Sequence, residues 1–244
     1  MRLASMKTPG LAHRLDRALR RIAATIALLS AGIAGGASEK SPPGPSAAKA
    51  VDSNGWKNLF DGKTLAGWKP SKFATQREVS VEKSFQDGGG AIVMELGEEL
   101  SGVTWTHAAD LPVLNYEIAL EAMKLDGDDF FCGLTFPVGK SSCSFIAGGW
   151  GGTIVGLSSV DGMDASENET SSSRAFDRNR WYRIRVRVTA EKIEAWIDDE
   201  QVVDLATKDR KITIRYGAIE NSLPLGIAAY QTRTAVRGIR LRRL

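Results

Sequence analysis

The segment from Trp181 to Asp198 constrains the fold more than any other part of the chain. Apolar side chains alternate with charged or aromatic ones over residues 181–188, and the same alternation returns over residues 192–198. A period of two predicts two antiparallel strands, each with one face in a core and the other in solvent. The segment therefore predicts a β-hairpin.

The turn of this hairpin fixes which side chains are opposite one another. A two-residue turn at Ala190-Glu191 brings opposite charges and a cation–π pair into register, whereas a loop one residue longer would destroy the match. The predicted pairs are Arg187 with Glu194, Arg185 with Trp196, and Arg183 with Asp198.

Short strands and turns continue through the rest of residues 55–244. Asp61-Gly62, Asp126-Gly127 and Asp161-Gly162 separate runs of β-forming residues, and no window shows an amphipathic helix of about a dozen residues. Many short strands without helices predict an all-β sandwich or barrel. The predicted strands are 56–60, 64–69, 78–84, 91–96, 102–106, 113–124, 129–136, 143–148, 153–158, 181–189, 192–198, 200–204, 225–230 and 235–243.

Residues 1–37 have the features of a cleavable signal peptide. A basic stretch ends at Arg20-Arg21, an apolar run covers 22–34, and small residues follow at 35–37. The run is shorter than the about 20 residues of a membrane span, although an uncleaved anchor is the alternative. We expect an exported protein, periplasmic or extracellular, with no stable transmembrane span after signal cleavage.

The charge of the chain is concentrated in this leader. It holds six basic side chains against Asp16 alone, so the formal net charge of +3 does not describe the remainder, which is slightly acidic. The basic balance is therefore no argument for nucleic-acid binding. Residues 38–54 are rich in Pro, Ser and Ala and have little to bury, which predicts a disordered linker before a domain at 55–244.

The two cysteines leave two alternatives open. If the turn between Cys132 and Cys143 is centred on Pro137-Val138, the two residues face each other, and export permits a disulfide. Otherwise both are buried thiols that act as small apolar residues. A zinc site is disfavoured, because His107 is the only histidine beyond the leader.

Two features favour sugar binding. Trp150 lies among four glycines in 148–152, and an exposed tryptophan there would stack on a sugar ring; alternatively its ring packs on the core and the glycines form tight turns. Arg183, Arg185, Glu194 and Trp196 share one sheet face that suits sugars, and the simpler alternative is a solvated ladder of ion pairs.

Acidic loops supply candidate ligands and catalysts. Residues 161–170 are rich in oxygen ligands and are a candidate calcium site, with a solvated acidic loop as the alternative. No nucleophile elbow, phosphate loop or dinucleotide motif is present, so hydrolysis would more plausibly use paired carboxylates. The candidates are Glu117, Glu121, Asp129 and Glu169.

Five segments in order resemble the 3-keto-disaccharide hydrolase domain family. The resemblance spans roughly residues 55–244 and implies a concanavalin A-like jelly-roll β-sandwich of an exported, glycan-processing protein. The implied activity is cleavage of 3-keto-glycosides. The family is also described as similar to family 16 glycoside hydrolases, whose Glu-x-Asp-x-x-Glu motif this chain lacks. The segments are Trp56–Trp68, Tyr116–Glu121, Gly152–Leu157, Arg180–Val203 and residues 225–241.

The resemblance implies a role for Glu121, and the main hypothesis adds further site residues. Glu121 takes the place of the family's characteristic glutamate and is the predicted acid or base, with Glu169 as the second catalytic carboxylate. The predicted substrate-binding residues are Asp129, Trp150, Asn168 and Gln231.

The chain departs from the family pattern at two places. Asn-Ser-Gly is replaced by residues 131–133, Phe-Cys-Gly, and Leu-Gln-Asp-His-Gly is replaced by residues 227–231, Ile-Ala-Ala-Tyr-Gln. The main hypothesis is a secreted hydrolase or lyase acting on 3-keto-glycosides. Because polar side chains are lost, a non-catalytic lectin-like carbohydrate-binding module and a surface adhesion domain stay open as alternatives.

Overall fold

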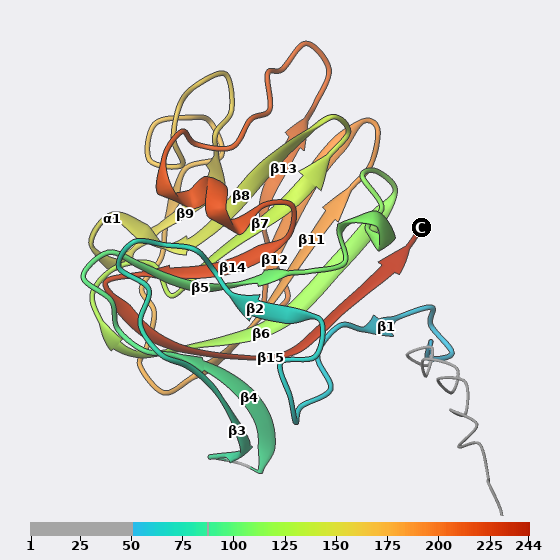
Figure 1. Ribbon diagram of the computed structural model, residues 1–244. Coiled ribbons are helices and arrows are strands. Elements are labelled where there is room, and N and C mark those ends of the chain that lie inside the picture. Colours follow the sequence, from blue (N-terminus) through green and yellow to red (C-terminus); the bar gives the residue numbers. More distant parts are fainter. Residues whose placement is uncertain (1–50, 87) are drawn as a thin grey trace, which may run out of the picture. The chain divides into compact units, whose positions relative to one another are not determined.

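The computed structural model describes residues 51–86 and 88–244, which form two antiparallel sheets packed face to face (Figure 1). This arrangement confirms the predicted all-β sandwich. The predicted signal peptide and all but the last four residues of the predicted linker lie outside the described residues. No helix in the described ranges is long and apolar enough to cross a membrane.

The eight-stranded sheet has the order β13-β12-β11-β6-β15-β4-β3, with β1 pairing with β15. Its strands are β1 (Lys57–Asn58), β3 (Val79–Phe85), β4 (Gly89–Met94), β6 (Tyr116–Gly127), β11 (Trp181–Val188), β12 (Lys192–Ile197), β13 (Glu200–Ala206) and β15 (Thr232–Arg243).

The seven-stranded sheet has the order β10-β9-β8-β7-β14-β5-β2. Its strands are β2 (Trp68–Pro70), β5 (Leu100–Trp105), β7 (Cys132–Val138), β8 (Ser141–Gly148), β9 (Ile154–Ser158), β10 (Ser172–Ser173) and β14 (Gly226–Tyr230). The helical elements of the described residues are all short: the 3-10 turns η1 (Ala108–Asp110) and η2 (Ala218–Ser222), and α1 (Gly149–Gly152).

The core lies between the two sheets, because each strand turns alternate side chains inward. Ile118 and Leu120 of β6 meet the core from one sheet, and Leu134 and Phe136 of β7 from the other. Full burial of such a side chain contributes about 1.5–3 kcal/mol. The buried Tyr116 satisfies its hydroxyl by donating to the Pro137 carbonyl at 2.7 Å.

The hairpin predicted from the sequence forms with the predicted register. Arg187 is opposite Glu194, and Arg185 is opposite Trp196, with the Arg185 guanidinium carbon 3.7 Å from the indole centroid. The regular ladder ends one pair earlier than predicted, but the amide of Asp198 still donates to the Arg183 carbonyl at 2.7 Å. In β15, Ile239 and Leu241 face inward as their alternation requires.

Two local predictions differ from the structure. Most of the predicted strand 64–69 is a turn, because the Asp61 carboxylate accepts hydrogen bonds from the amides of Lys63 and Thr64 at 2.8 and 2.7 Å. Residues 51–54, the end of the predicted linker, form a second such turn. There the Asp52 carboxylate accepts from the Trp56 amide at 2.9 Å.

The structure decides the cysteine alternatives in favour of two buried thiols. The turn lies at Gly139 and Lys140, so Cys143 is opposite Phe136 while Cys132 is opposite Ala147. The turn centred on Pro137-Val138, and with it the disulfide, is therefore wrong. Gly139 accounts for the difference, since its φ of +58° suits the turn better than a side-chain-bearing residue would.

Neither thiol is expected to react with a thiol reagent in the native protein. Burial raises the pKa of both Cys132 and Cys143 to about 12, and the thiolate is the reactive species. Both should react in denaturant without added reductant. A protein that shows no reactive thiol when unfolded would contradict this prediction.

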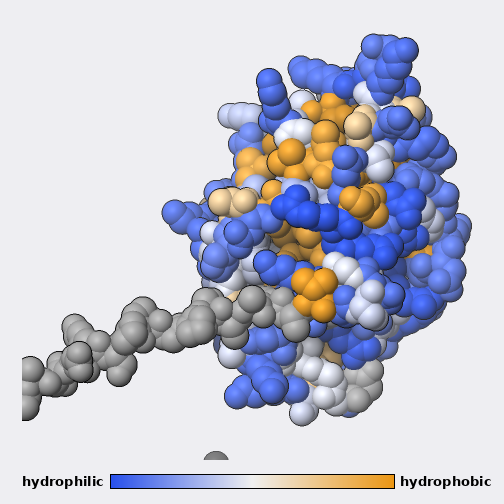
Figure 2. Space-filling view, turned by 90° about the vertical axis from the view of Figure 1, so that its right-hand side faces the viewer, coloured by the Kyte–Doolittle hydropathy of each residue, from blue (hydrophilic) through white to orange (hydrophobic). Residues whose placement is uncertain are grey.

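Eight large hydrophobic residues are exposed among the described residues. Figure 2 shows one face of the molecule, where hydrophobic residues form a patch among hydrophilic ones. Single exposed apolar residues are ordinary in folded proteins. Of the large exposed hydrophobic residues, Trp150 and Tyr216 line the same surface hollow. Two exposed aromatic rings in one hollow indicate a candidate ligand site.

Candidate functional site

The outer face of the seven-stranded sheet is built to receive aromatic rings. A Cβ atom at Gly133 would lie 2.9 Å from the ring of Phe130, and one at Gly102 would lie 3.0 Å from the ring of Phe73. The first distance is shorter than Cβ contacts in proteins, and at Gly102 the Ile227 carbonyl oxygen would be closer still, at 2.6 Å. Both rings therefore lie close against the sheet. Phe130 lines a groove on this face, and Phe73 packs beside it in a cluster with Leu100 and Ala228.

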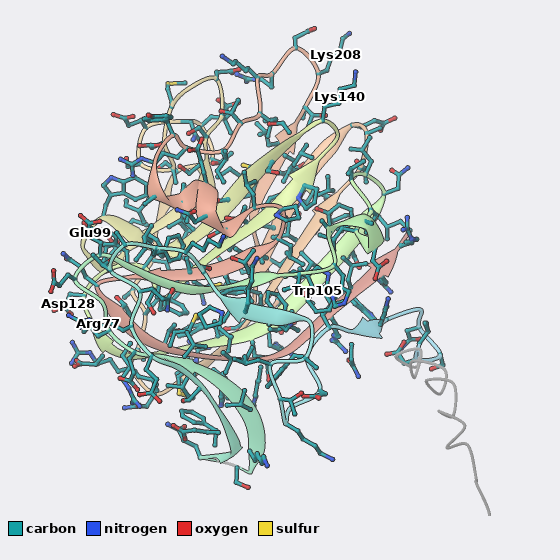
Figure 3. All side chains as sticks on the ribbon, in the orientation of Figure 1. Arg77, Glu99, Trp105, Asp128, Lys140 and Lys208 are labelled. Atoms are coloured by element: carbon teal, nitrogen blue, oxygen red, sulfur yellow. The ribbon has the colours of Figure 1, made fainter. Side chains whose placement is uncertain are left out.

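Two adjoining hollows of about 310 and 210 Å³ form this groove. They share four side chains: Phe130, Trp150, Arg215 and Tyr230. Ser144 of β8 and Ser158 of β9 line the larger hollow, together with Glu99, and Asp129 lines the smaller one. Figure 3 shows where the groove lies in the sandwich. Glu99 and Asp128, the residue before Asp129, lie toward the end where α1 is, whereas Lys140 and Lys208 lie toward another end.

Trp150 stands out in this groove because its backbone is strained. Its φ and ψ are 47° and 58°, and its side chain remains 40% exposed. A left-handed backbone costs a bulky residue on the order of 1–3 kcal/mol, and such outliers cluster at functional sites. Gly148, Gly151 and Gly152 take up the other positive-φ positions of the turn, with φ of 81°, 85° and 97°.

Asp129 fixes this turn from the neighbouring loop. One of its carboxylate oxygens accepts from the amide of Gly151 at 3.1 Å, and the other accepts from the amide of Phe130 at 2.7 Å. The predicted site residues Asp129 and Trp150 are thus brought together. Each carboxylate oxygen keeps a further lone pair for a ligand.

Arg215 closes the groove on the side of the loop 161–170. Its guanidinium carbon is 5.9 Å from the Trp150 ring centroid, and its Nε lies 3.2 Å from a carboxylate oxygen of Asp164. The other carboxylate oxygen of Asp164 accepts from the hydroxyl of Ser158 at 3.1 Å. The loop is therefore tied to the groove through Arg215 and Ser158.

Asn168 lies inside this loop and organises it. Its side-chain amide is buried and donates to the carbonyls of Leu157, Met163 and Asp164 at 2.7, 3.1 and 2.7 Å. Its carbonyl oxygen accepts from the amide and hydroxyl of Thr170 at 3.0 and 2.6 Å. The structure thus occupies Asn168 with loop contacts and does not place it in either hollow of the groove.

Replacing Asn168 by Ala is expected to lower the free energy of unfolding by about 1–3 kcal/mol, because it leaves buried polar groups unsatisfied. Chemical denaturation measures the change. The matched control is Asn221→Ala, because the exposed Asn221 amide makes a single bond to the Ala218 carbonyl. Equal stabilities for the two variants would contradict this account of Asn168.

The carboxylates of the acidic loop face arginines. Arg210 binds both Asp161, at 2.8 Å, and Glu169. The amide of Lys211 and the guanidinium of Arg210 hold the pKa of Asp161 below its ordinary value. Among the described residues, no three His, Cys, Asp or Glu side chains form a group able to hold a metal ion. Calcium binding by this loop stays a prediction.

Glu121 lies on the other sheet. It belongs to β6, accepts from the Nε of Arg237 at 2.7 Å, and lines a separate hollow of about 420 Å³ with Trp56, Arg183 and Arg240. Glu169 does not line this hollow; it binds Arg210 in the acidic loop. The structure does not bring the two predicted catalytic carboxylates together.

Gln231 follows β14 but turns away from the groove. Its side-chain amide donates to the Glu98 carbonyl at 2.9 Å and it does not line either hollow. Its neighbour Tyr230, which the sequence did not single out, lines both. The alternation within β14 could have identified Tyr230, whereas no local pattern marks Arg215.

One of the departures at residues 227–231 falls at the groove. Ala228 packs against Phe73 and Leu100 on the outer face, and Tyr230 lines both hollows. The sequence resemblance implies Gln and His at these two positions. At the groove itself, Tyr230 therefore supplies an aromatic ring at the position where the resemblance implies His.

Comparisons with known proteins identify the family. A family model described as the 3-keto-alpha-glucoside-1,2-lyase-like domain matches residues 55–242. No curated protein matches the chain. Among solved structures, a putative glycosyl hydrolase from Parabacteroides distasonis ATCC 8503 is 11% identical with a TM-score of 0.47, covering 80% of this chain and 99% of its own.

Two further solved structures are similar. The carbohydrate-binding module CBM66 from Bacillus subtilis is 11% identical with a TM-score of 0.44, covering 72% of this chain and 95% of its own. The apo Crh5 transglycosylase is 11% identical with a TM-score of 0.49, and the match covers 80% of this chain and 87% of the transglycosylase. With the family model matched over nearly the whole sandwich, the chain belongs to the carbohydrate-active family of 3-keto-alpha-glucoside-1,2-lyase-like domains.

Proposed function

We propose that the chain binds a glycan in the groove on the outer face of its seven-stranded sheet. The observation that supports this most directly is Trp150, an exposed indole held in a strained turn above the groove. A sugar ring has an apolar face that stacks on an aromatic side chain. A stacked ligand would explain why the chain retains a costly exposed ring there.

The polar groups of the groove suit sugar hydroxyls. Asp129 accepts hydrogen bonds, Arg215 donates them, and the hydroxyls of Ser144 and Ser158 do both. Small-molecule sites typically combine an apolar lining with a few such groups. Tyr230 and Phe130, whose ring centroids are 6.0 Å apart, supply the apolar part.

A second candidate is the lyase or hydrolase activity on 3-keto-glycosides that the family description names. Asp129 and Arg215 favour it, since one hollow holds both a carboxylate and a guanidinium. A ketone at C3 acidifies the C2 proton, so Asp129 would remove that proton while Arg215 stabilises the charge on the ketone oxygen. The electron pair then forms the C1–C2 double bond and expels the glycosidic oxygen from C1, which takes up the proton held by Asp129. Water adds across this double bond afterwards.

Titration with 3-keto-glucosides and their unoxidised parents separates the two functions. Binding without product release supports the lectin-like module. Product release that is lost in Asp129→Asn, but kept in the matched control Asp128→Asn, supports the lyase. Neither binding nor release, with tight binding of another protein, would support the adhesion alternative and contradict both. Each titration is repeated with added calcium, which tests the prediction that the loop 161–170 binds this ion.

We also propose that the leader directs export. Cell fractionation should find the protein outside the cytoplasm, and N-terminal sequencing should begin near residue 38. A cytoplasmic protein with an intact leader would contradict this proposal.

A further inference from the structure

We propose a second ligand site on the outer face of the eight-stranded sheet, which takes a sugar bearing a carboxylate, such as a uronic acid. The site is the hollow of about 420 Å³ that Glu121 lines. It lies on the sheet opposite the groove and does not depend on the function proposed for that groove.

The hollow exists because a small residue interrupts a ladder of charged ones. Glu117, Ala119 and Glu121 follow one another on the outer face of β6, and Ala119 is opposite Arg185 of β11 and Arg240 of β15. An alanine between two arginines leaves an opening. The register of β15 shifts between Arg237 and Arg240, and the intervening Gly238 adds no side chain to close it.

The charges around the opening leave one arginine uncompensated. Arg237 pairs with Glu121, Arg185 with Glu117, and Arg183 with Asp199, at 2.7, 2.8 and 2.8 Å. Arg240 forms no ion pair with any carboxylate of the described residues, and its guanidinium carbon lies 4.8 Å from the Trp56 ring centroid. An exposed guanidinium beside an indole is suited to a ligand carboxylate, which it can bind with two parallel hydrogen bonds.

The remaining lining suits the rest of a sugar. Asn58 supplies an amide, while Glu121 and Asp199 supply carboxylates that accept from hydroxyls. The hollow falls in the range of about 300–1,000 Å³ that is usual for small-molecule sites. A simple anion would bind only Arg240. A uronic acid would bind Arg240 through its carboxylate and the amide and carboxylate groups of the lining through its hydroxyls.

Indole N–H signals in a nitrogen-15 NMR spectrum test the site on the full chain. Glucuronate is expected to shift the Trp56 signal, with affinity at least tenfold weaker in Arg240→Gln and unchanged in the control Arg243→Gln. A second variant, Ala119→Leu, fills the opening without changing charge and is expected to abolish the shift. Trp150→Ala should leave it intact, which separates this site from the groove.

Three results would overturn the proposal. The first is an unmoved Trp56 signal, and the second is an equal response to acetate, which would mean an anion contact without a sugar site. The third is an unchanged affinity in both Arg240→Gln and Ala119→Leu.

Discussion

Replacing Glu117 by Gln is expected to lower the free energy of unfolding by about 3 kcal/mol, at the lower end of the range for breaking a buried ion pair. The Glu117 side chain is fully buried, yet it binds Arg185, Arg187 and Arg242 at 2.8, 2.7 and 2.5 Å. The variant would leave three adjacent guanidinium groups without a counter-charge. Their partial exposure, 29–34%, moderates the loss through solvent screening.

Chemical denaturation measures this loss, and Glu121→Gln is the matched control on the same strand. Glu121 is 33% exposed and pairs with Arg237, so its replacement should cost less than about 1 kcal/mol. Similar losses for the two variants would contradict the role assigned to Glu117.

The ion pairs of Glu117 with its three arginines also predict that the protein loses stability in acid. Burial alone would raise the pKa of Glu117, but hydrogen bonds and charge from Arg187 and Arg242 bring it below its ordinary value of 4.5. A pKa lower in the folded state gives stability that is complete above the ordinary pKa and is lost as the pH falls through the folded pKa. Stability should therefore fall less steeply below pH 4.5 in Glu117→Gln than in the unchanged protein.

Replacing Trp150 by Ala is expected to weaken glycan binding in the groove by roughly 30-fold or more, which corresponds to about 2 kcal/mol for a central aromatic contact. Trp150→Phe keeps a ring and should keep much of the affinity. Isothermal titration measures both. Stability should change little, because the Trp150 side chain is half-exposed and its strained backbone contributes nothing favourable.

The control for this variant is Trp196→Phe, on the other sheet. Trp196 contacts Arg185 and Arg187 but lines no part of the groove. Unchanged affinity in Trp150→Ala, or an equal loss in Trp196→Phe, would contradict the assignment of the groove.

The register of the hairpin could be predicted because its information is local. Alternation fixed the faces, and the charge pair Arg187–Glu194 with the cation–π pair Arg185–Trp196 fixed the register across a short turn. The same reasoning failed between the cysteines, where a turn centred two residues earlier satisfies the alternation equally well. Only the left-handed backbone at Gly139 distinguishes the two registers.

The site was predictable only in part, for a related reason. Trp150 and Asp129 showed local signals, a glycine-rich loop and an acidic turn. Alternation in β14 places Tyr230 on an outer face but does not show that it meets Trp150. Arg215 joins them through contacts between distant segments, and no local pattern marks it. Alternation in β6 does place Glu121 on an outer face, but it does not say that this face belongs to the sheet opposite the groove.

The central claim, that a glycan occupies the groove, is tested most directly by the indole N–H signals of the six tryptophans. Titration with a neutral glycan, the 3-keto-glucoside or its parent, should shift the signal of Trp150 while the other five stay in place. Binding that shifts Trp56 or Trp196 and leaves Trp150 unmoved would place the ligand on the opposite sheet and contradict the account.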